Sequence, residues 1–153
     1  MRLLVMLQSN DLGEVVNIDS EVIGNDSRRD YIKKAIDEAR CIGIKQENEF
    51  MGYLIFDTHF FDCSFISLLI VKPTERRKGY ATSLIQHFIS VAPTTKIFSS
   101  TNQSNRQMHE VFKKNGFIQS GYVDNLDEGD PEIIYFRNKK GESYYELLYN
   151  KRK

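Results

Sequence analysis

Residues 69–82 read Leu-Ile-Val-Lys-Pro-Thr-Glu-Arg-Arg-Lys-Gly-Tyr-Ala-Thr, and the fold can be inferred from this stretch more than from any other. It closes an apolar run, residues 65–71, in which polar and apolar positions do not alternate. Such a run is typical of a strand that is covered on both faces and is therefore central in its sheet. Pro73 cannot take part in a central ladder, so the strand stops before it. A helix begins at Gly79, and the stretch is thus a strand-to-helix junction.

The start of this helix is suited to binding an anion. The first-turn N–H groups of a helix are unpaired and carry a partial positive charge. Gly79 and Ala81 remove side-chain bulk, while Arg76, Arg77 and Lys78 add full positive charges. The sequence therefore predicts a phosphate or pyrophosphate cradle. Taken alone, the same residues equally fit a solvated basic loop that caps an ordinary helix.

Working outward, the junction belongs to a strand–helix–strand unit. The helix spans residues 79–91, and residues 96–101 are the next strand. With about a dozen helical residues between them, the two strands should run parallel through a right-handed crossover.

The remaining elements predict a mixed sheet. We expect α/β (α+β) architecture, with about six or seven mostly antiparallel strands, a parallel central pair, and helices on both faces. The further predicted strands are residues 3–7, 41–44, 50–56, 117–126 and 132–137, and the further helices are 9–24, one that starts at 26–27, and 105–114.

Length and charge restrict the class of protein. We expect residues 1–153 to form one domain, with residues 138–153 as a docked final piece or a loose tail. The 21 basic and 21 acidic residues cancel, which argues against nucleic acid and anionic membranes as partners. Cys41 and Cys63 are expected to be buried in a reducing compartment. No apolar run reaches membrane-spanning length, and residues 1–7 are too short for a signal peptide, so we expect a cytoplasmic protein.

A second motif follows the junction. Residues 105–117 read Asn-Arg-Gln-Met-His-Glu-Val-Phe-Lys-Lys-Asn-Gly-Phe. Together the two stretches resemble the GNAT superfamily of N-acetyltransferases. The first resembles its signature [RQ]-x-x-G-x-[GA], preceded by L-x-V-x-P. The second resembles N-x-x-A-x-x-L-Y-x-x-x-G-F, except that Met108 stands in place of alanine and Phe112 in place of tyrosine.

The resemblance implies a fold and a co-substrate. Acetyl-CoA would lie in the gap where the two parallel strands splay apart, its pantetheine arm pairing with the backbone of the first strand. No metal is implied, and a homodimer is one arrangement that is common in the family. The residues that the resemblance places at the cofactor are Leu69, Val71, Arg76, Arg77, Lys78, Gly79, Tyr80, Ala81, Thr82, Asn105 and Phe112.

The resemblance also implies direct attack of an amine on the thioester. The N–H of Leu69 would stabilise the oxyanion. Phe112 cannot donate the proton that the family's tyrosine often gives to the leaving thiolate. Either Tyr122 or Tyr135 supplies it, or the thiolate leaves unaided, or the protein is a non-catalytic acyl-CoA-binding sensor or regulatory module. No carboxylate base stands out, because residues 65–67 are Phe, Ile and Ser, and a water relay is an acceptable substitute.

The acceptor is expected to be a primary amine of a small molecule or peptide. The loop of residues 124–131 carries four carboxylates, and Asp127 and Glu128 are candidates for attracting a cationic amine. The same loop equally fits an ordinary soluble hairpin turn. The three histidines show no metal-ligand spacing.

Overall fold

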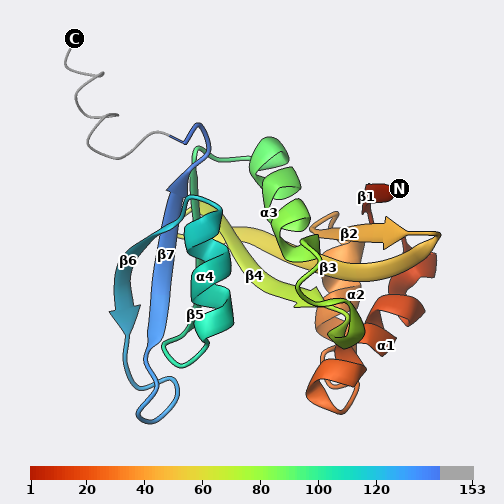
Figure 1. Ribbon diagram of the computed structural model, residues 1–153, viewed down its shortest axis with the longest axis horizontal. Helices are drawn as coiled ribbons and strands as arrows, with labels where there is room; N and C mark the ends of the chain where they lie inside the picture. The colour runs from red at the N-terminus through yellow and green to blue at the C-terminus, as the bar shows by residue number, and fades with distance from the viewer. Residues whose placement is uncertain (142–153) are drawn as a thin grey trace. The chain divides into compact units, whose positions relative to one another are not determined.

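The computed structural model describes residues 1–141 (Figure 1). Within them, the chain forms four α-helices and seven strands. The elements are β1 (Arg2–Met6), η1 (Ser9–Asp11), α1 (Leu12–Ile23), α2 (Arg29–Asp37), β2 (Cys41–Gln46), β3 (Glu49–Phe60), β4 (Cys63–Val71), η2 (Pro73–Glu75), α3 (Tyr80–Val91), β5 (Lys96–Asn102), α4 (Arg106–Lys114), β6 (Ile118–Val123) and β7 (Glu132–Asn138).

The strands hydrogen-bond in the order β1-β2-β3-β4-β5-β7-β6. β4 and β5 are parallel, with Ser64 opposite Ile97 and Ile66 opposite Ser99. The pairs β1–β2, β2–β3, β5–β7 and β6–β7 are antiparallel. The predicted mixed sheet with its parallel central pair is confirmed.

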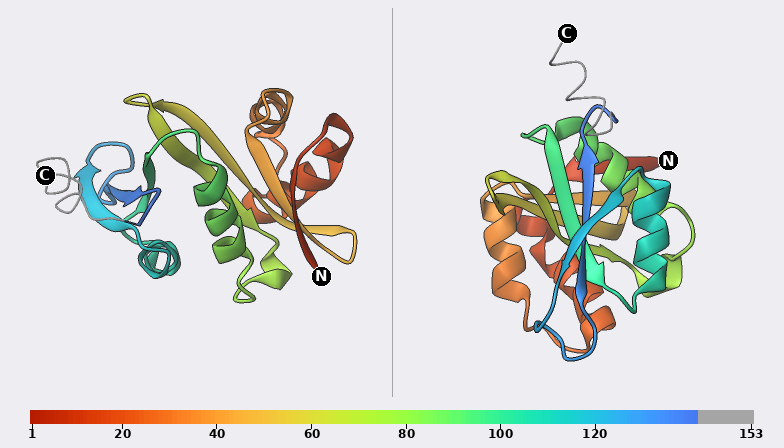
Figure 2. Two further views of the ribbon diagram at one scale, coloured as in Figure 1. Left: turned by 90° about the horizontal axis from the view of Figure 1, so that it is seen from above. Right: turned by 90° about the vertical axis from the view of Figure 1, so that its left-hand side faces the viewer.

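The described chain divides into two compact units, and the first comprises residues 1–57 and 67–88. Here α1 and α2 cover one face of the strands and α3 covers the other (Figure 2). Val15, Ile32 and Tyr53, each completely buried, belong to the core beneath α1 and α2. On the opposite face the rings of Phe56 and Phe88 lie 4.6 Å apart.

Within the described residues, the second unit comprises residues 58–66 and 89–141. α4 packs on one face of β5, β7 and β6, where the ring of Phe112 stacks on that of Tyr135 at 4.8 Å. The opposite face carries Phe98 and Phe136, whose ring centroids are 5.1 Å apart. We call this second surface the open face of the unit, because it holds a solvent-accessible pocket.

Local signals in the sequence determine where several helices begin and end. α1 stops at Gly24, which adopts the left-handed conformation at φ 85°. Asn105 caps α4 by accepting a hydrogen bond from the N–H of Met108 at 3.2 Å. Gly116, after α4, has φ 83°. These predicted ends are confirmed.

Other predicted features differ from the structure. The second helix begins at Arg29 rather than at residues 26–27, and β6 ends at Val123. β4 is the middle strand, yet most of its residues are only half-buried. Alternate side chains, Leu68 and Ile70, pack against the first unit's core. Leu69 points to the other face, because successive side chains of a strand point to opposite faces, and it remains partly uncovered.

Cys63 also differs from the expectation, because it is half-buried, whereas Cys41 is fully buried as expected. Of the predicted tail, Asn138 ends β7, and residues 142–153 lie outside the described residues. Within residues 1–141, no helix is both long and apolar enough to cross a membrane.

Candidate functional site

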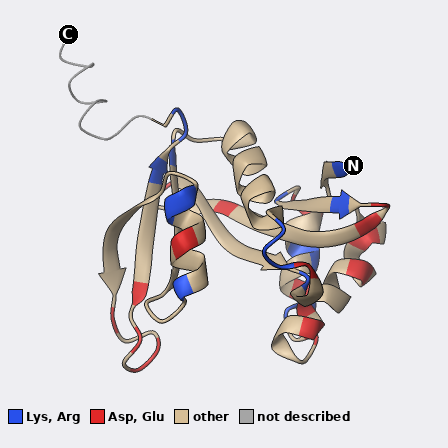
Figure 3. Ribbon diagram, viewed as in Figure 1, with Lys and Arg blue, Asp and Glu red and all other residues tan. Residues whose placement is uncertain are grey.

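The predicted cradle lies in the first unit, between β4 and α3. Arg77 and Gly79 both have left-handed backbones, with φ 65° and 84°, and α3 begins at Tyr80. The four residues before α3 are exposed to solvent, and the ribbon of this connection carries the blue of Lys and Arg (Figure 3). The start of α3 therefore adjoins a basic turn that is accessible to solvent, as an anion site requires.

The positive charge of one basic side chain in the cradle is balanced by a neighbouring carboxylate. Lys78 forms an ion pair with Glu75, and the hydrogen bond from Lys78 to this carboxylate raises the pKa of Lys78. Among residues 1–141, Arg76 and Arg77 form no such ion pair.

Arg2, on β1, also contacts the cradle, and sequence reasoning missed it. Its Nη1 donates to the Ser83 hydroxyl at 3.2 Å, and its Nη2 donates to the carbonyl of Lys78. The guanidinium lies 4.2 Å from the ring centroid of Tyr80. A cation is thus held at the start of α3 by an element far away in sequence, and no local signal could have revealed it.

The parallel pairing of β4 with β5 ends at Ile66 and Ser99. The Ser99 hydroxyl donates to the carbonyl of Ile66 at 2.8 Å and secures this last pair. Leu69 and Val71, the predicted backbone partners of the cofactor arm, follow on β4 beyond it. Their roles stay predictions.

On the α4 face of the second unit, Tyr135 is hydrogen-bonded to His109. The His109 Nε2 contacts the carbonyls of Asn102 and Gln103 at 3.1 and 3.0 Å, so it carries the proton. Nδ1 is then the acceptor for the Tyr135 hydroxyl. Tyr135 is completely buried, and its proton is directed to an imidazole; its proposed role as a general acid stays a prediction.

Phe112 is 1% exposed and packs between Phe117 and Tyr135. In this structure its ring is part of the core of the second unit, and its predicted contact with the cofactor is not tested. The carboxamide of Asn105 is used as the cap of α4.

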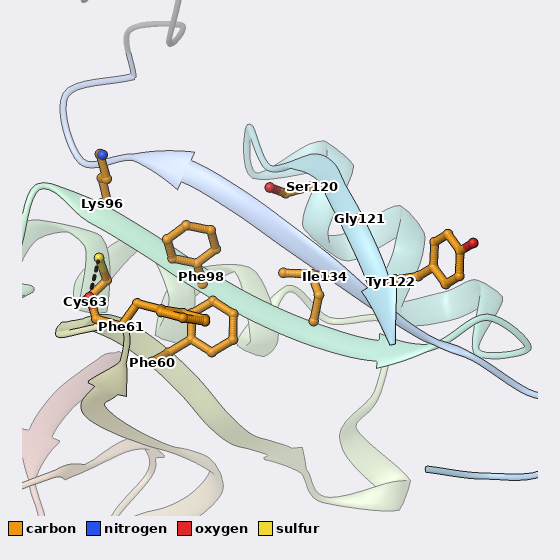
Figure 4. Close-up of a pocket in the computed structure, with 9 residues that line it drawn as sticks. All are labelled: Phe60, Phe61, Cys63, Lys96, Phe98, Ser120, Gly121, Tyr122 and Ile134. Carbon is orange, nitrogen blue, oxygen red and sulfur yellow. Dashed lines mark hydrogen bonds between the residues drawn. The ribbon is translucent and has the colours of Figure 1, made fainter. Parts of the chain in front are cut away.

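The open face of the second unit holds a pocket of about 500 Å³ (Figure 4). The rings of Phe60, Phe61 and Phe98 gather on one side of it, and Ile134 on β7 lies between them and Tyr122. Phe60 contacts both other rings, at centroid distances of 5.1 and 5.0 Å. The full lining is Phe60, Phe61, Cys63, Lys96, Phe98, Ser120, Gly121, Tyr122 and Ile134.

Tyr122, the other candidate general acid, is 65% exposed on β6. Figure 4 shows its hydroxyl directed away from the three phenylalanine rings. Its role in proton transfer is likewise untested.

Two carboxylates of the 124–131 loop are engaged within the second unit. Asp127 accepts a hydrogen bond from Asn102 Nδ2 at 2.8 Å. Asp130 accepts from the backbone N–H and hydroxyl of Ser104, at 3.0 and 2.6 Å. These contacts give the loop a structural role, and binding of a cationic amine by Asp127 or Glu128 stays a prediction.

A further carboxylate, Glu132, lies on β7 directly after this loop. The Ser100 hydroxyl donates to Glu132 Oε2 at 2.6 Å. The sequence did not predict this contact, because the register in which β7 pairs with β5 cannot be read from the sequence of either strand. Within residues 1–141, no group of three or more metal-ligating side chains is present.

Comparisons with known proteins agree with this geometry. A family model described as "Acetyltransferase (GNAT) family" matches residues 10–117. An acetyltransferase of the GNAT family from Bacillus cereus ATCC 10987 is 56% identical, with a TM-score of 0.88 over 90% of this chain and 97% of that chain. A search of curated proteins found no match.

More distant structures share the fold. The ribosomal-protein-S18-alanine N-acetyltransferase from Escherichia coli is 16% identical, with a TM-score of 0.75 over 89% of this chain and 92% of that chain. An N-acetyltransferase from Staphylococcus aureus Mu50 is 15% identical, with a TM-score of 0.74 over 91% and 99%.

Proposed function

This chain belongs to the acetyltransferase (GNAT) family, and from that premise we propose that it moves an acetyl group from acetyl-CoA to a primary amine of a small molecule or peptide. Transfer takes place by direct attack in a ternary complex. The family membership makes the chain an acyltransferase. The amine acceptor and the roles of individual residues are the proposal.

The observation that carries the proposal is the exposed basic turn before α3. The pyrophosphate of CoA is held by the N–H groups of residues 77–82, with Arg76 and Arg77 adding positive charge. Gly79 has φ 84° and no Cβ, so a phosphate can approach its backbone. Arg2 keeps this turn in place through Lys78 and Ser83.

The thioester arm lies along β4, with Leu69 and Val71 as its backbone partners. Leu69 N–H stabilises the oxyanion that forms when the amine attacks. Removing the hydroxyls of Tyr122 and Tyr135 one at a time tests protonation of the thiolate. If both Tyr→Phe variants keep wild-type kcat, the thiolate leaves unaided, which its ordinary pKa of about 8.5 permits.

The experiment measures binding and turnover separately. Calorimetry with CoA measures the affinity of the cradle for the coenzyme. A thiol-detection assay with acetyl-CoA and a panel of primary amines measures acetyl transfer. We expect Gly79→Glu to abolish both, because a carboxylate would occupy the position of the phosphate. Gly13→Glu is the matched control, since Gly13 lies in α1 and a Cβ there meets nothing within 4 Å.

Two outcomes contradict the proposal. If the Gly79→Glu variant still bound CoA with wild-type affinity, the turn before α3 would not be part of the CoA site. Tight CoA binding without thiol release for any amine would make this chain a binding module instead.

A further inference from the structure

We propose that the open face of the second unit is the acceptor site, that Glu132 is the base for the incoming ammonium group, and that the acceptor carries an apolar or aromatic group beside its primary amine. This inference rests on the proposed acetyl transfer and names its base and substrate class.

The side chains of the open face form successive rows across β5 and β7. The register places Phe98 opposite Phe136, Ser100 opposite Ile134 and Asn102 opposite Glu132. These pairs are two residues apart, so all three rows lie on the same face. The face therefore changes from aromatic to acidic along the strands.

The aromatic end is the pocket of about 500 Å³. Phe60 and Phe98 form its floor, and Phe61, at 86% exposed, forms its edge. A pocket of this volume with aromatic walls fits a phenyl ring or a short alkyl chain, whose burial is favourable by the hydrophobic effect.

The acidic end is held in place. Ser100 donates to Glu132 Oε2, which restricts the carboxylate and leaves Oε1 without a hydrogen bond within residues 1–141. Ile134 lines the pocket, and Glu132 lies two residues before it on the same face of β7. It is thus about 7 Å along the strand from the pocket wall. A ligand whose ammonium group is separated from a ring by two carbons spans this distance.

The carboxylate also lies where the sheet pairing changes. Ile66 and Ser99 are the last registered pair of β4 and β5, and Ser100 is the next residue on β5. Ser100, which holds Glu132, therefore directly follows the last hydrogen-bonded pair of the two parallel strands.

The proton balance is complete. The acceptor enters as R–NH₃⁺ and gives one proton to Glu132, so its N–H electron pair stays on nitrogen. That pair attacks the acetyl carbonyl carbon, the C–S bond breaks, and sulfur leaves with the bonding electrons. The second amine proton passes to the thiolate, giving the N-acetyl amine and CoA thiol. Glu132 then releases its proton to solvent.

Other charged groups near Glu132 are already engaged or distant. Asp127 and Asp130 of the adjoining loop bond Asn102 and Ser104. Lys96 lies in the pocket at the far end of β5. His109 contacts β5 from the α4 side.

The test uses 2-phenylethylamine, hexylamine and ethylamine as acceptors for the full-length protein at saturating acetyl-CoA. We expect kcat/KM to be at least tenfold higher for the first two than for ethylamine. Glu132→Gln should lower kcat/KM by about 100-fold, the usual contribution of a general base. Glu110 is an exposed glutamate on α4, and Glu110→Gln, the matched control, should leave kcat/KM unchanged.

The pH profile separates a base from a structural residue. For Glu132→Gln, kcat/KM should rise about tenfold per pH unit up to the pKa of the amine, because only free amine then reacts. Phe61→Ala should raise KM for 2-phenylethylamine about tenfold and leave KM for ethylamine unchanged, while Leu3→Ala, an exposed apolar residue on β1, should change neither.

The outcomes are distinguishable. Equal kcat/KM for ethylamine and 2-phenylethylamine, or a Glu132→Gln variant with the wild-type pH profile, would overturn this inference and leave acetyl transfer standing. Failure of every amine together with loss of CoA binding would overturn the proposed function.

Discussion

Replacing Gly79 with alanine perturbs the start of α3 in two ways that can be separated. The residue has φ 84°, a conformation that disfavours any residue with a Cβ by about 1–2 kcal/mol. The lower entropy of the unfolded alanine chain offsets part of this, so the backbone term is about 1 kcal/mol. Gly24 has φ 85° at the end of α1, and a Cβ there meets nothing within 4 Å. Gly24→Ala therefore measures the backbone term alone.

The second perturbation is displacement of Arg2. A Cβ at Gly79 would lie 3.3 Å from Arg2 Nη1, close enough to push the guanidinium away. The contacts at risk are the hydrogen bonds to Ser83 and Lys78 and the position over Tyr80. Because the guanidinium is exposed, we expect their loss to add about 1 kcal/mol.

Urea unfolding should therefore give a free energy of unfolding about 2 kcal/mol below wild type for Gly79→Ala and about 1 kcal/mol below for Gly24→Ala. In an Arg2→Met background the two glycine variants should become equal, because the contact is already lost. The dissociation constant for CoA should rise about tenfold only for Gly79→Ala, corresponding to one weakened hydrogen bond to phosphate. Equal losses in the wild-type background, or a difference that persists in Arg2→Met, would refute the reasoning about Arg2.

Two further predictions concern thiol reactivity and the first unit's ion pair. Burial raises the pKa of Cys41 to about 12, and its side chain is 0% exposed, so iodoacetamide at pH 8 should label the half-buried Cys63 alone. Mass spectrometry of the native protein checks this, and a Cys63→Ser variant that is still labelled would contradict it. Arg28→Met should lower the free energy of unfolding by about 3 kcal/mol, because it leaves Asp19, 1% exposed, without its ion-pair partner. The same substitution at Lys33, whose ion pair is exposed, should change it by less than about 0.5 kcal/mol, and equal losses in a urea titration would count against the role of burial.

Much of the fold could be predicted because its signals are local. Gly24 and Asn105 end and begin helices through their own conformation and side chain. The apolar run of β4 identified a central strand, but it could not show that alternate residues of that strand remain half-buried. Burial depends on what packs on each face, and that information lies in other segments of the chain.

The candidate site divides in the same way. The exposed basic turn before α3 was predictable from its glycine and arginines, because a helix start and its charges are adjacent in sequence. Two of the loop carboxylates, Asp127 and Asp130, proved to be tied to residues of β5 and the turn after it. Neither this engagement nor the contact between Ser100 and Glu132 follows from composition.

The order of strands and helices, the parallel central pair and the position of the exposed basic turn before α3 can all be read from the sequence alone. All three follow from periodicity, turn residues and charges that lie within about a dozen residues of one another. Only the tertiary structure decided that Arg2 reaches the start of α3 and that Glu132 stands beside Ser100 on the open face. Both contacts join segments at least 30 positions apart, and strand register, which a single sequence specifies only weakly, brings them together.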